Sequence, residues 1–321
     1  VIVWGAGPEG IANKAAGTPK ITKRVTSELG AVCPTIVVPG PWTDADIAFQ
    51  AEQVATQKLH NSGFNCVACQ VLVVSSDWAQ KDTLLSRLET TMKDSHAREL
   101  YYPGTVDRLG GFAEHHPGVK PLSRQGAEAV LIAPLDPQNT RARTVEVFAP
   151  AMSVAELPGS DPVAFLKAAI EFANTQLYGT LGANIVIHPK TIAQIGRARF
   201  EEMLVDLHYG TIAINAWTGL GFLTPQATWG AFPGHTLADV QSGIGIVHNT
   251  MLFEKPERTV VEAPFKPFPR NLLSGSFTLL PRPPWFITNR KGAILGRLLV
   301  EFQYRPSFLK MPRIFLNALL G

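Results

Sequence analysis

The sequence predicts an α/β fold in which a largely parallel sheet is covered by helices on both faces. Short apolar, β-branched runs such as 35–38, 71–74 and 211–215 have the length and composition of buried strands. Amphipathic helical segments separate these runs along the chain. Such alternation is typical of parallel sheets, because parallel strands need long crossover connections.

The first 40 residues indicate a strand, a glycine turn, a short helix over 11–16 and a second strand over 35–38. The turn Gly5-x-Gly7-x-x-Gly10 matches the dinucleotide-binding fingerprint. That fingerprint expects an acid at the end of the next strand, whereas Glu28 is expected to precede its strand. A glycine turn that only lets a helix pack on a strand therefore stays an alternative. Because Val1 already reads as the middle of a strand, we expect the true N-terminus to lie upstream.

Thr43 is expected to N-cap the first long helix, with Asp46 as its acidic partner and Gly63 as its stop. The Gly- and Pro-rich segment 100–125 is expected to be loop. The remaining pattern predicts strands at 71–74, 129–133, 145–148, 184–187 and 211–215, and helices at 84–92, 162–173 and 192–205.

The composition limits the class of protein. Hydrophobic residues make up 45% and charged residues 17%, which excludes a disordered chain. The 29 basic and 26 acidic residues give a charge of +3, too small to indicate a nucleic-acid partner. Three cysteines predict a reducing compartment, the cytoplasm, and no disulfide framework. No run approaches the ~18 apolar residues of a membrane span, so no integral membrane segment is expected.

Cys66 is the candidate nucleophile. It ends the motif Asn61-Ser62-Gly63-Phe64-Asn65-Cys66, between a long helix and a buried strand, and cysteine attacks as the thiolate. Cys69 leaves three alternatives open: a redox pair, half of a zinc site with His115 and His116, or two inert core cysteines. Adjacent histidines point to different sides, so no metal is expected. Glu28 gains interest only as a partner of Cys66, since a lone glutamate is most often solvated.

Six short motifs together resemble the aldehyde dehydrogenase superfamily, in the family's order over about residues 1–235. This stretch corresponds to the family's second half. The motifs are Trp4 to Gly10, Glu28 to Ala31 running into Pro34, Asn61-x-Gly63-x-x-Cys66, Glu146 to Pro150, Asn174 to Gly179 and Gly210 to Asn215. The resemblance implies an aldehyde-dehydrogenase-like fold with a remnant of a Rossmann-type cofactor domain. It also implies NAD(P)-dependent oxidation of an aldehyde to a carboxylic acid.

The resemblance further implies roles for single residues. Cys66 would attack the aldehyde, giving a thiohemiacetal and then a thioester, and Glu28 would activate the deacylating water. Gly5 and Gly10 would shape the turn at the cofactor pyrophosphate, while Glu146 would hold the nicotinamide ribose with Phe148 packed near the nicotinamide. The cofactor would be NAD or NADP. The partners would be a small-molecule aldehyde and, at full length, further copies in a homo-oligomer.

Four positions depart from the family's motifs: Ala6, Ala31, Asn65 and Ala149. The family's first half also has no counterpart here, including the asparagine that completes the oxyanion hole. The chain alone is therefore expected to be a fragment with little or no activity, since losing one oxyanion donor typically costs ~10²–10³ in rate. A CoA-acylating relative and a non-catalytic protein on the same scaffold remain alternatives. Glu28 argues against the former, because a hydrolytic base would waste the thioester.

Three parts are expected along the chain. Residues 1–40 would be the remnant of the dinucleotide-binding domain, 41–235 the catalytic α/β domain and 236–321 a proline-rich tail. Within this tail, residues 254–321 hold 11 basic and 4 acidic residues, so this stretch carries +7 and residues 1–253 carry −4. The tail is expected to return to the cofactor domain or to pack on a neighbouring subunit. We favour this over a basic amphipathic helix at 308–320 on a membrane, because the Phe and Leu spacing is irregular.

Overall fold

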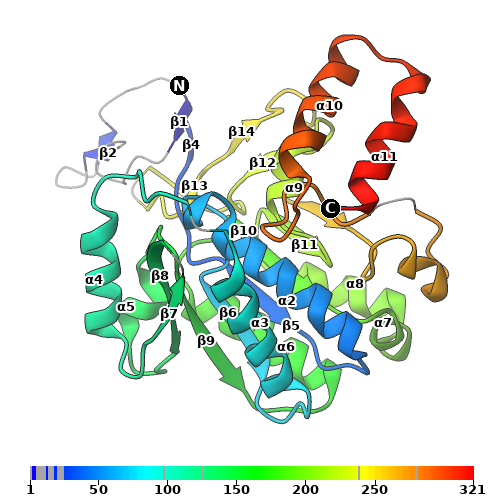
Figure 1. The fold of residues 1–321 in the computed structure, drawn as a ribbon. Helices are drawn as coiled ribbons and strands as arrows, with labels where there is room; N and C mark the ends of the chain where they lie inside the picture. The colour runs from blue at the N-terminus through cyan, green and yellow to red at the C-terminus, as the bar shows by residue number, and fades with distance from the viewer. Residues whose placement is uncertain are drawn as a thin grey trace.

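A computed structural model describes residues 2–4, 12–13, 18–19, 25–96, 98–124, 126–237, 239–278 and 281–321. Its centre is an eight-stranded sheet, parallel except for the edge strand β7, with helices on both faces (Figure 1). The predicted α/β class is confirmed. In spatial order the strands are β15 (Thr259–Glu262), β11 (Thr211–Ile214), β10 (Gly182–Val186), β5 (Pro34–Val37), β6 (Val71–Ser75), β9 (Ala151–Leu157), β8 (Ala127–Pro134) and β7 (Lys120–Arg124).

Successive side chains of the central strands enter two separate cores. On β6, Val71 and Val73 pack with α6 and α8, while Leu72 and Val74 pack with α2 and α3 on the other face. Because both faces are buried, these strands need apolar residues at successive positions, which made them visible in the sequence. The helices around the sheet are α2 (Asp44–Leu59), α3 (Lys81–Asp94), α4 (Thr105–His115), α5 (Thr140–Thr144), α6 (Pro162–Gln176), α7 (Pro189–Ile195), α8 (Arg197–Val205) and α9 (Gly219–Leu223).

The start of α2 follows its sequence signal closely. The Thr43 side chain accepts a hydrogen bond from the Asp46 N–H, and the Asp46 carboxylate accepts one from the Thr43 N–H. This reciprocal pair satisfies two backbone donors that the helix itself leaves free. The predicted N-cap is confirmed.

Two short elements differ from their predictions. The pattern predicts a helix over 11–16, but Ala12–Asn13 form β2, which pairs with β3 (Thr18–Pro19) in an antiparallel ribbon. The pattern also predicts a strand over 145–148, but these residues are loop. Phe148 has a φ of +43°, which turns the chain before β9 and is incompatible with an extended strand.

The loop predicted over 100–125 and the single helix predicted over 192–205 are also wrong. The segment 100–125 contains α4 and β7 in spite of its glycines and prolines, because the apolar side chains of Leu109 and Phe112 are buried on one face. The single helix expected over 192–205 is divided into α7 and α8. Gly196, with a φ of +88°, separates them.

Glu28 ends a strand that the sequence pattern misses. β4 (Thr26–Glu28) pairs with β1 (Ile2–Trp4) in parallel and with β13 (Gly243–Ile244) in antiparallel, so the prediction that Glu28 precedes its strand is wrong. A Cβ at Gly243 would overlap the carbonyl of Ser27, and Gly243 has a φ of +130°. Glycine therefore permits the close approach of β13 to β4. A further ribbon pairs β12 (Trp229–Gly230) with β14 (Ile246–His248).

The tail first folds back on α2. Asp46 forms ion pairs with Arg270 at 2.6 Å and Lys266 at 3.2 Å, and the rings of Phe286 and Phe49 stack with centroids 5.5 Å apart. The tail then ends in two antiparallel helices. Its remaining elements are η2 (Arg270–Ser274), α10 (Gly292–Tyr304), η3 (Phe308–Lys310) and α11 (Met311–Leu319).

Each of the three expected parts contributes to the central sheet, through β5, through β6 to β11, and through β15. The division at residues 40 and 235 stays a prediction. Within the described ranges, no helix combines the length and the apolar character needed to cross a membrane.

Candidate active site

Cys66 lies in a tight loop that follows α2. Asn61 and Gly63 have φ angles of 53° and 83° in the 3-10 turn η1 (His60–Gly63). A Cβ at Gly63 would collide with the carbonyl of Ala149, so glycine lets this loop approach the segment before β9. The side chain of Asn65 closes the turn with a 2.7 Å hydrogen bond to the first carbonyl of η1. Local backbone geometry thus fixes the half-buried Cys66.

The Glu28 carboxyl faces the Cys66 thiol, although the two are far apart in the sequence. The thiol lies within hydrogen-bonding reach of the carboxyl, and each group shifts the pKa of the other. Glu28 is only 4% exposed, and its Oε1 has no hydrogen-bond partner among the described residues. The carboxyl therefore keeps an unused acceptor at a position shielded from solvent.

Burial sets the protonation of this pair. It raises the pKa of Glu28 from 4.5 to about 7, partly offset by the hydrogen bond from Cys66. Burial also raises the pKa of the Cys66 thiol well above its ordinary value, and the neighbouring Glu28 charge raises it further. Near neutral pH the carboxyl is therefore about half ionised, while Cys66 is a thiol. A carboxyl with a pKa near neutrality can both accept and return a proton.

Glu146 is the second carboxylic acid of this cluster. It is half-buried in the loop after α5, and burial raises its pKa to about 8, while the Lys58 charge acts in the opposite direction. A Cβ at Gly30 would overlap the Glu146 carboxylate, so Gly30 leaves the room that this carboxylate occupies. The charge of Glu28 also raises the pKa of Glu146, and both acids act on Cys66. Three distant segments therefore meet in one electrostatic cluster.

Phe148 lies next to the same loop. Its ring packs against Phe64 and Tyr102, with centroid distances of 5.8 and 5.0 Å, and Phe64 belongs to the Cys66 loop. Gly5 and Gly10, the predicted cofactor turn, lie outside the described residues. The roles predicted for these residues stay predictions, but the structure brings Cys66, Glu28, Glu146 and Phe148 together.

The alternatives for Cys69 can be compared with its surroundings. All three cysteines are free thiols. Cys69 is fully buried and hydrogen-bonds Thr35. His116 stacks on Phe112, with ring centroids 3.8 Å apart. Among the residues that the structure describes, no group of three or more His, Cys, Asp and Glu side chains could hold a metal ion.

Two buried residues of this site are missed by the sequence analysis. Cys33 donates a 3.3 Å hydrogen bond from Sγ to the carbonyl of Cys66. Lys58 is 1% exposed; burial lowers its pKa to about 8, and the nearby Cys69 and Glu146 oppose this shift. Lys58 follows the buried Val54 by four residues on α2, so the helical period alone could have placed it inside.

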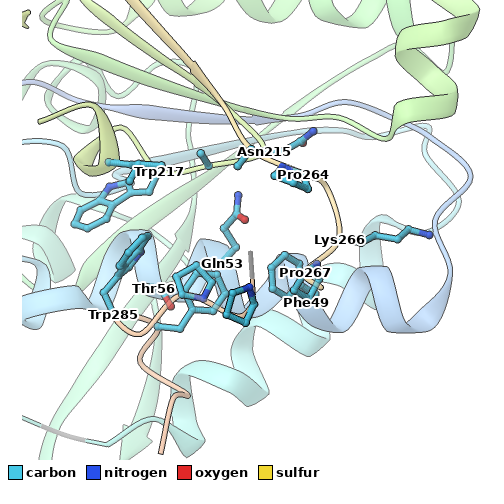
Figure 2. A pocket seen from close by; sticks show the side chains of 15 residues that line it. Phe49, Gln53, Thr56, Asn215, Trp217, Pro264, Lys266, Pro267 and Trp285 are labelled. Carbon is cyan, nitrogen blue, oxygen red and sulfur yellow. The ribbon is translucent and has the colours of Figure 1, made fainter. Parts of the chain in front are cut away.

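A separate cavity of about 80 Å³ lies between α2, the segment after β11 and the tail (Figure 2). Trp217 and Trp285 flank it, and Gln53 points into it from α2. The predicted catalytic residues do not line this cavity. Trp217 Nε1 donates a 2.9 Å hydrogen bond to the carbonyl of Val67, the neighbour of Cys66. This indole therefore joins the cavity wall to the Cys66 loop.

The parallel sheet with helices on both faces is the fold of solved aldehyde dehydrogenases. Residues 8–100 match the model of the aldehyde dehydrogenase family, and solved aldehyde dehydrogenases share the fold. The recognition of the superfamily from the six sequence motifs is confirmed. No curated protein sequence matches the chain.

Three solved structures illustrate the likeness. The aldehyde dehydrogenase KauB from Pseudomonas aeruginosa is 19% identical with a TM-score of 0.59, and the match covers 79% of this chain and 50% of KauB. The NADP-dependent glyceraldehyde-3-phosphate dehydrogenase from Bacillus halodurans C-125, complexed with NADP, is 20% identical with a TM-score of 0.56, covering 77% and 48%. The NAD-dependent aldehyde dehydrogenase from Sinorhizobium meliloti is 19% identical with a TM-score of 0.54, covering 72% and 44%. The chain thus spans about half the length of these relatives.

Proposed function

We propose that this chain carries the catalytic centre for NAD(P)-dependent oxidation of an aldehyde to a carboxylic acid. The observation that carries the proposal is the Glu28–Cys66 pair, a thiol facing a buried carboxyl whose pKa is about 7. The family match over 8–100 and the shared fold support the reaction class. The relatives named as NAD- or NADP-dependent support the cofactor class.

Cys66 is the proposed nucleophile. Ionised Glu28 accepts the thiol proton, and Sγ then adds to the aldehyde carbon. The new C–S bond moves the carbonyl electron pair onto oxygen, where the main-chain N–H of Cys66 is the proposed hydrogen-bond donor.

The residues near Cys66 fit the nicotinamide end of NAD(P). Burial raises the pKa of Glu146; Lys58 and Arg108 attract its negative charge, Glu28 repels it, and no described residue hydrogen-bonds its carboxylate. Its carboxylate therefore keeps acceptors for ribose hydroxyls, and the Phe148 ring lies beside the same loop. When bound, the cofactor accepts the hydride whose loss leaves a thioester on Cys66.

Glu28 then completes the proposed cycle. It first releases the thiol proton to solvent; ionised again, it takes a proton from a water molecule whose oxygen attacks the thioester carbon. The C–S bond breaks, the carboxylic acid forms and Cys66 leaves as a thiolate. Glu28 returns the proton to this thiolate, which restores the starting pair. A hydrolytic base beside the thioester favours water over coenzyme A as the acceptor.

An activated ester tests this proposal without any cofactor, because p-nitrophenyl acetate delivers an acyl group directly to a thiol. The chain should release about one p-nitrophenol per Cys66 in a burst, followed by slow turnover. Cys66→Ala should abolish the burst. Glu28→Gln should slow the burst, because the thiol loses its base, and should also slow deacylation by about 10²–10⁴-fold. A burst that survives Cys66→Ala, or deacylation that Glu28→Gln leaves unchanged, would refute the proposal.

A non-catalytic role on the same scaffold is the second candidate, and the raised pKa of Cys66 favours it. Iodoacetamide labelling followed by mass spectrometry separates the two candidates. A functional nucleophile should label at Cys66 much faster than at the fully buried Cys33 and Cys69. Equally slow labelling of all three thiols would support the non-catalytic role.

A further inference from the structure

The C-terminal hairpin, residues 292–320, projects away from the central sheet, with the turn between α10 and α11 at its far end (Figure 1). Its two helices bury a small core of their own, formed by Leu295, Leu298, Ile314 and Ala318. These contacts occupy one stripe of each helix. The remaining faces are left for water or for another surface.

The tip of the hairpin exposes large apolar side chains. Phe308 is 92% exposed, Leu309 is 91% exposed and Tyr304 is 77% exposed. Exposed apolar groups on this scale are unfavourable in water and mark surfaces that meet another apolar phase. Apolar side chains continue along the hairpin at Ile294, Leu299, Val300, Leu316, Leu319 and Leu320.

Positive charge surrounds these apolar groups. Residues 290–321 contain six basic residues and one acid, Glu301. None of the six cations forms an ion pair within the described part of the chain. Lys310 donates hydrogen bonds to the carbonyls of Glu301 and Arg305 at the end of α10, and the Arg305 guanidinium lies over the Tyr304 ring at 5.2 Å. The six are Arg290, Lys291, Arg297, Arg305, Lys310 and Arg313.

We propose that this hairpin docks the protein on an anionic lipid surface. Tyr304, Phe308 and Leu309 would enter the headgroup region, while Arg305 and Arg313 would pair with lipid phosphates. The excess positive charge of the hairpin favours an anionic lipid surface as its partner. A second copy of the hairpin would bring the same excess of positive charge, so self-association through this face would be opposed by repulsion.

Sedimentation of the full chain with vesicles tests the proposal. The vesicles are phosphatidylcholine with about 30% phosphatidylglycerol, compared with phosphatidylcholine alone, at about 0.1 M salt. We expect binding to the anionic vesicles to be at least about tenfold stronger, and to weaken at about 0.5 M salt. The variant Phe308→Ser/Leu309→Ser should weaken binding roughly 10–100-fold, and Arg305→Gln/Arg313→Gln roughly tenfold or more.

Met251→Ser/Leu273→Ser is the matched control, because it removes two apolar side chains that are 95% and 88% exposed outside the hairpin. It should bind as the unmodified chain does. The proposal is overturned if the chain ignores anionic vesicles, or if the control loses as much binding as the tip variant. Light scattering without vesicles gives a further outcome. A dimer that Phe308→Ser/Leu309→Ser dissociates would assign this face to a second copy and contradict the lipid proposal.

Discussion

The Cys66 site and the C-terminal hairpin depart in opposite directions from the usual separation of polar and apolar groups. Around Cys66, the ionisable side chains of Glu28 and Lys58 are withdrawn from water. At the hairpin tip, the apolar side chains of Phe308 and Leu309 are held in water. Each arrangement lowers the stability of the folded chain.

The two regions differ in what could offset this loss of stability. Burial holds the pKa values of Glu28 and Glu146 near neutrality, which suits both acids to proton transfer. The exposed apolar side chains of the hairpin contribute favourable free energy only when another surface covers them. The first region can therefore be tested by changing charge and pH within the isolated chain. The second must be tested by adding a surface.

The largest effect is expected at Gly243, which lets β13 approach β4 and Glu28. In Gly243→Ala, the added Cβ overlaps the carbonyl of Ser27 at a backbone φ of +130°. Strain and overpacking together should cost about 3–5 kcal/mol in the free energy of unfolding. Urea-induced unfolding measures this cost. The same change should slow deacylation, because β4 carries Glu28.

Gly234→Ala is the control for backbone strain. Gly234 has a φ of +119°, but a Cβ there meets no atom within 4 Å. Its substitution should cost only the strain, about 1–3 kcal/mol. Equal costs at the two positions would show that β13 does not hold Glu28 by close packing.

A smaller effect, with an unusual sign, is expected for Glu28→Gln. The folded chain holds the pKa of Glu28 at about 7, above its ordinary 4.5. Below pH 4.5 the carboxyl is protonated in both the folded and the unfolded chain, so its burial costs no stability through ionisation. As the pH rises from 4.5 through about 7, the unfolded chain ionises this group more readily, and the folded chain loses stability. Glutamine does not titrate, so Glu28→Gln should be more stable than the unmodified chain by about 3 kcal/mol at pH 8. At pH 5 the difference should fall to about 1 kcal/mol or less.

Thermal unfolding between pH 5 and pH 8 measures this difference. Glu171→Gln removes an exposed carboxylate from α6 and should change stability by less than about 0.5 kcal/mol at either pH. A gain at Glu28→Gln that does not depend on pH would mean that burial of the charge is not its cause. The stability gain would then have a cause other than the buried charge. The Cys66 site would no longer be a region that loses stability by keeping an ionisable group out of water.

The elements that the sequence reveals well are those whose own residues decide them. The capped start of α2 is a local hydrogen-bond pattern, and β5, β6, β10 and β11 are apolar at successive positions because both faces of the sheet are buried. β4 lacks such a signal. Its residues Thr26, Ser27 and Glu28 form a strand because β1 and β13 supply partners from distant parts of the chain.

The residues of the site divide in the same way, into those that a local pattern reveals and those that only distant segments bring together. The turn at Gly63 is readable from the motif around Cys66, since a local loop creates it. Spacing alone could not bring Glu28 and Glu146 to Cys66, and only the resemblance to a family suggested it. The alternating pattern of 145–148 predicts a strand, because pattern alone cannot register the turn at Phe148. Lys58 was hidden because a buried lysine contradicts its ordinary preference for the surface.

The smallest effect on the main unfolding transition is expected for Leu298→Ala in the hairpin. Leu298 belongs to the small core of the hairpin itself, so its loss should open α10 and α11 locally and shift the main transition by less than about 0.5 kcal/mol. Leu72→Ala, in the core between the sheet and α2, should instead lower the global free energy of unfolding by about 2–5 kcal/mol. Hydrogen exchange separates the two responses, because Leu298→Ala should unprotect only the hairpin amides. If it also unprotects β6 and β10, the hairpin belongs to the main cooperative unit. Its exposed tip would then be part of the central fold and no longer a separate docking element.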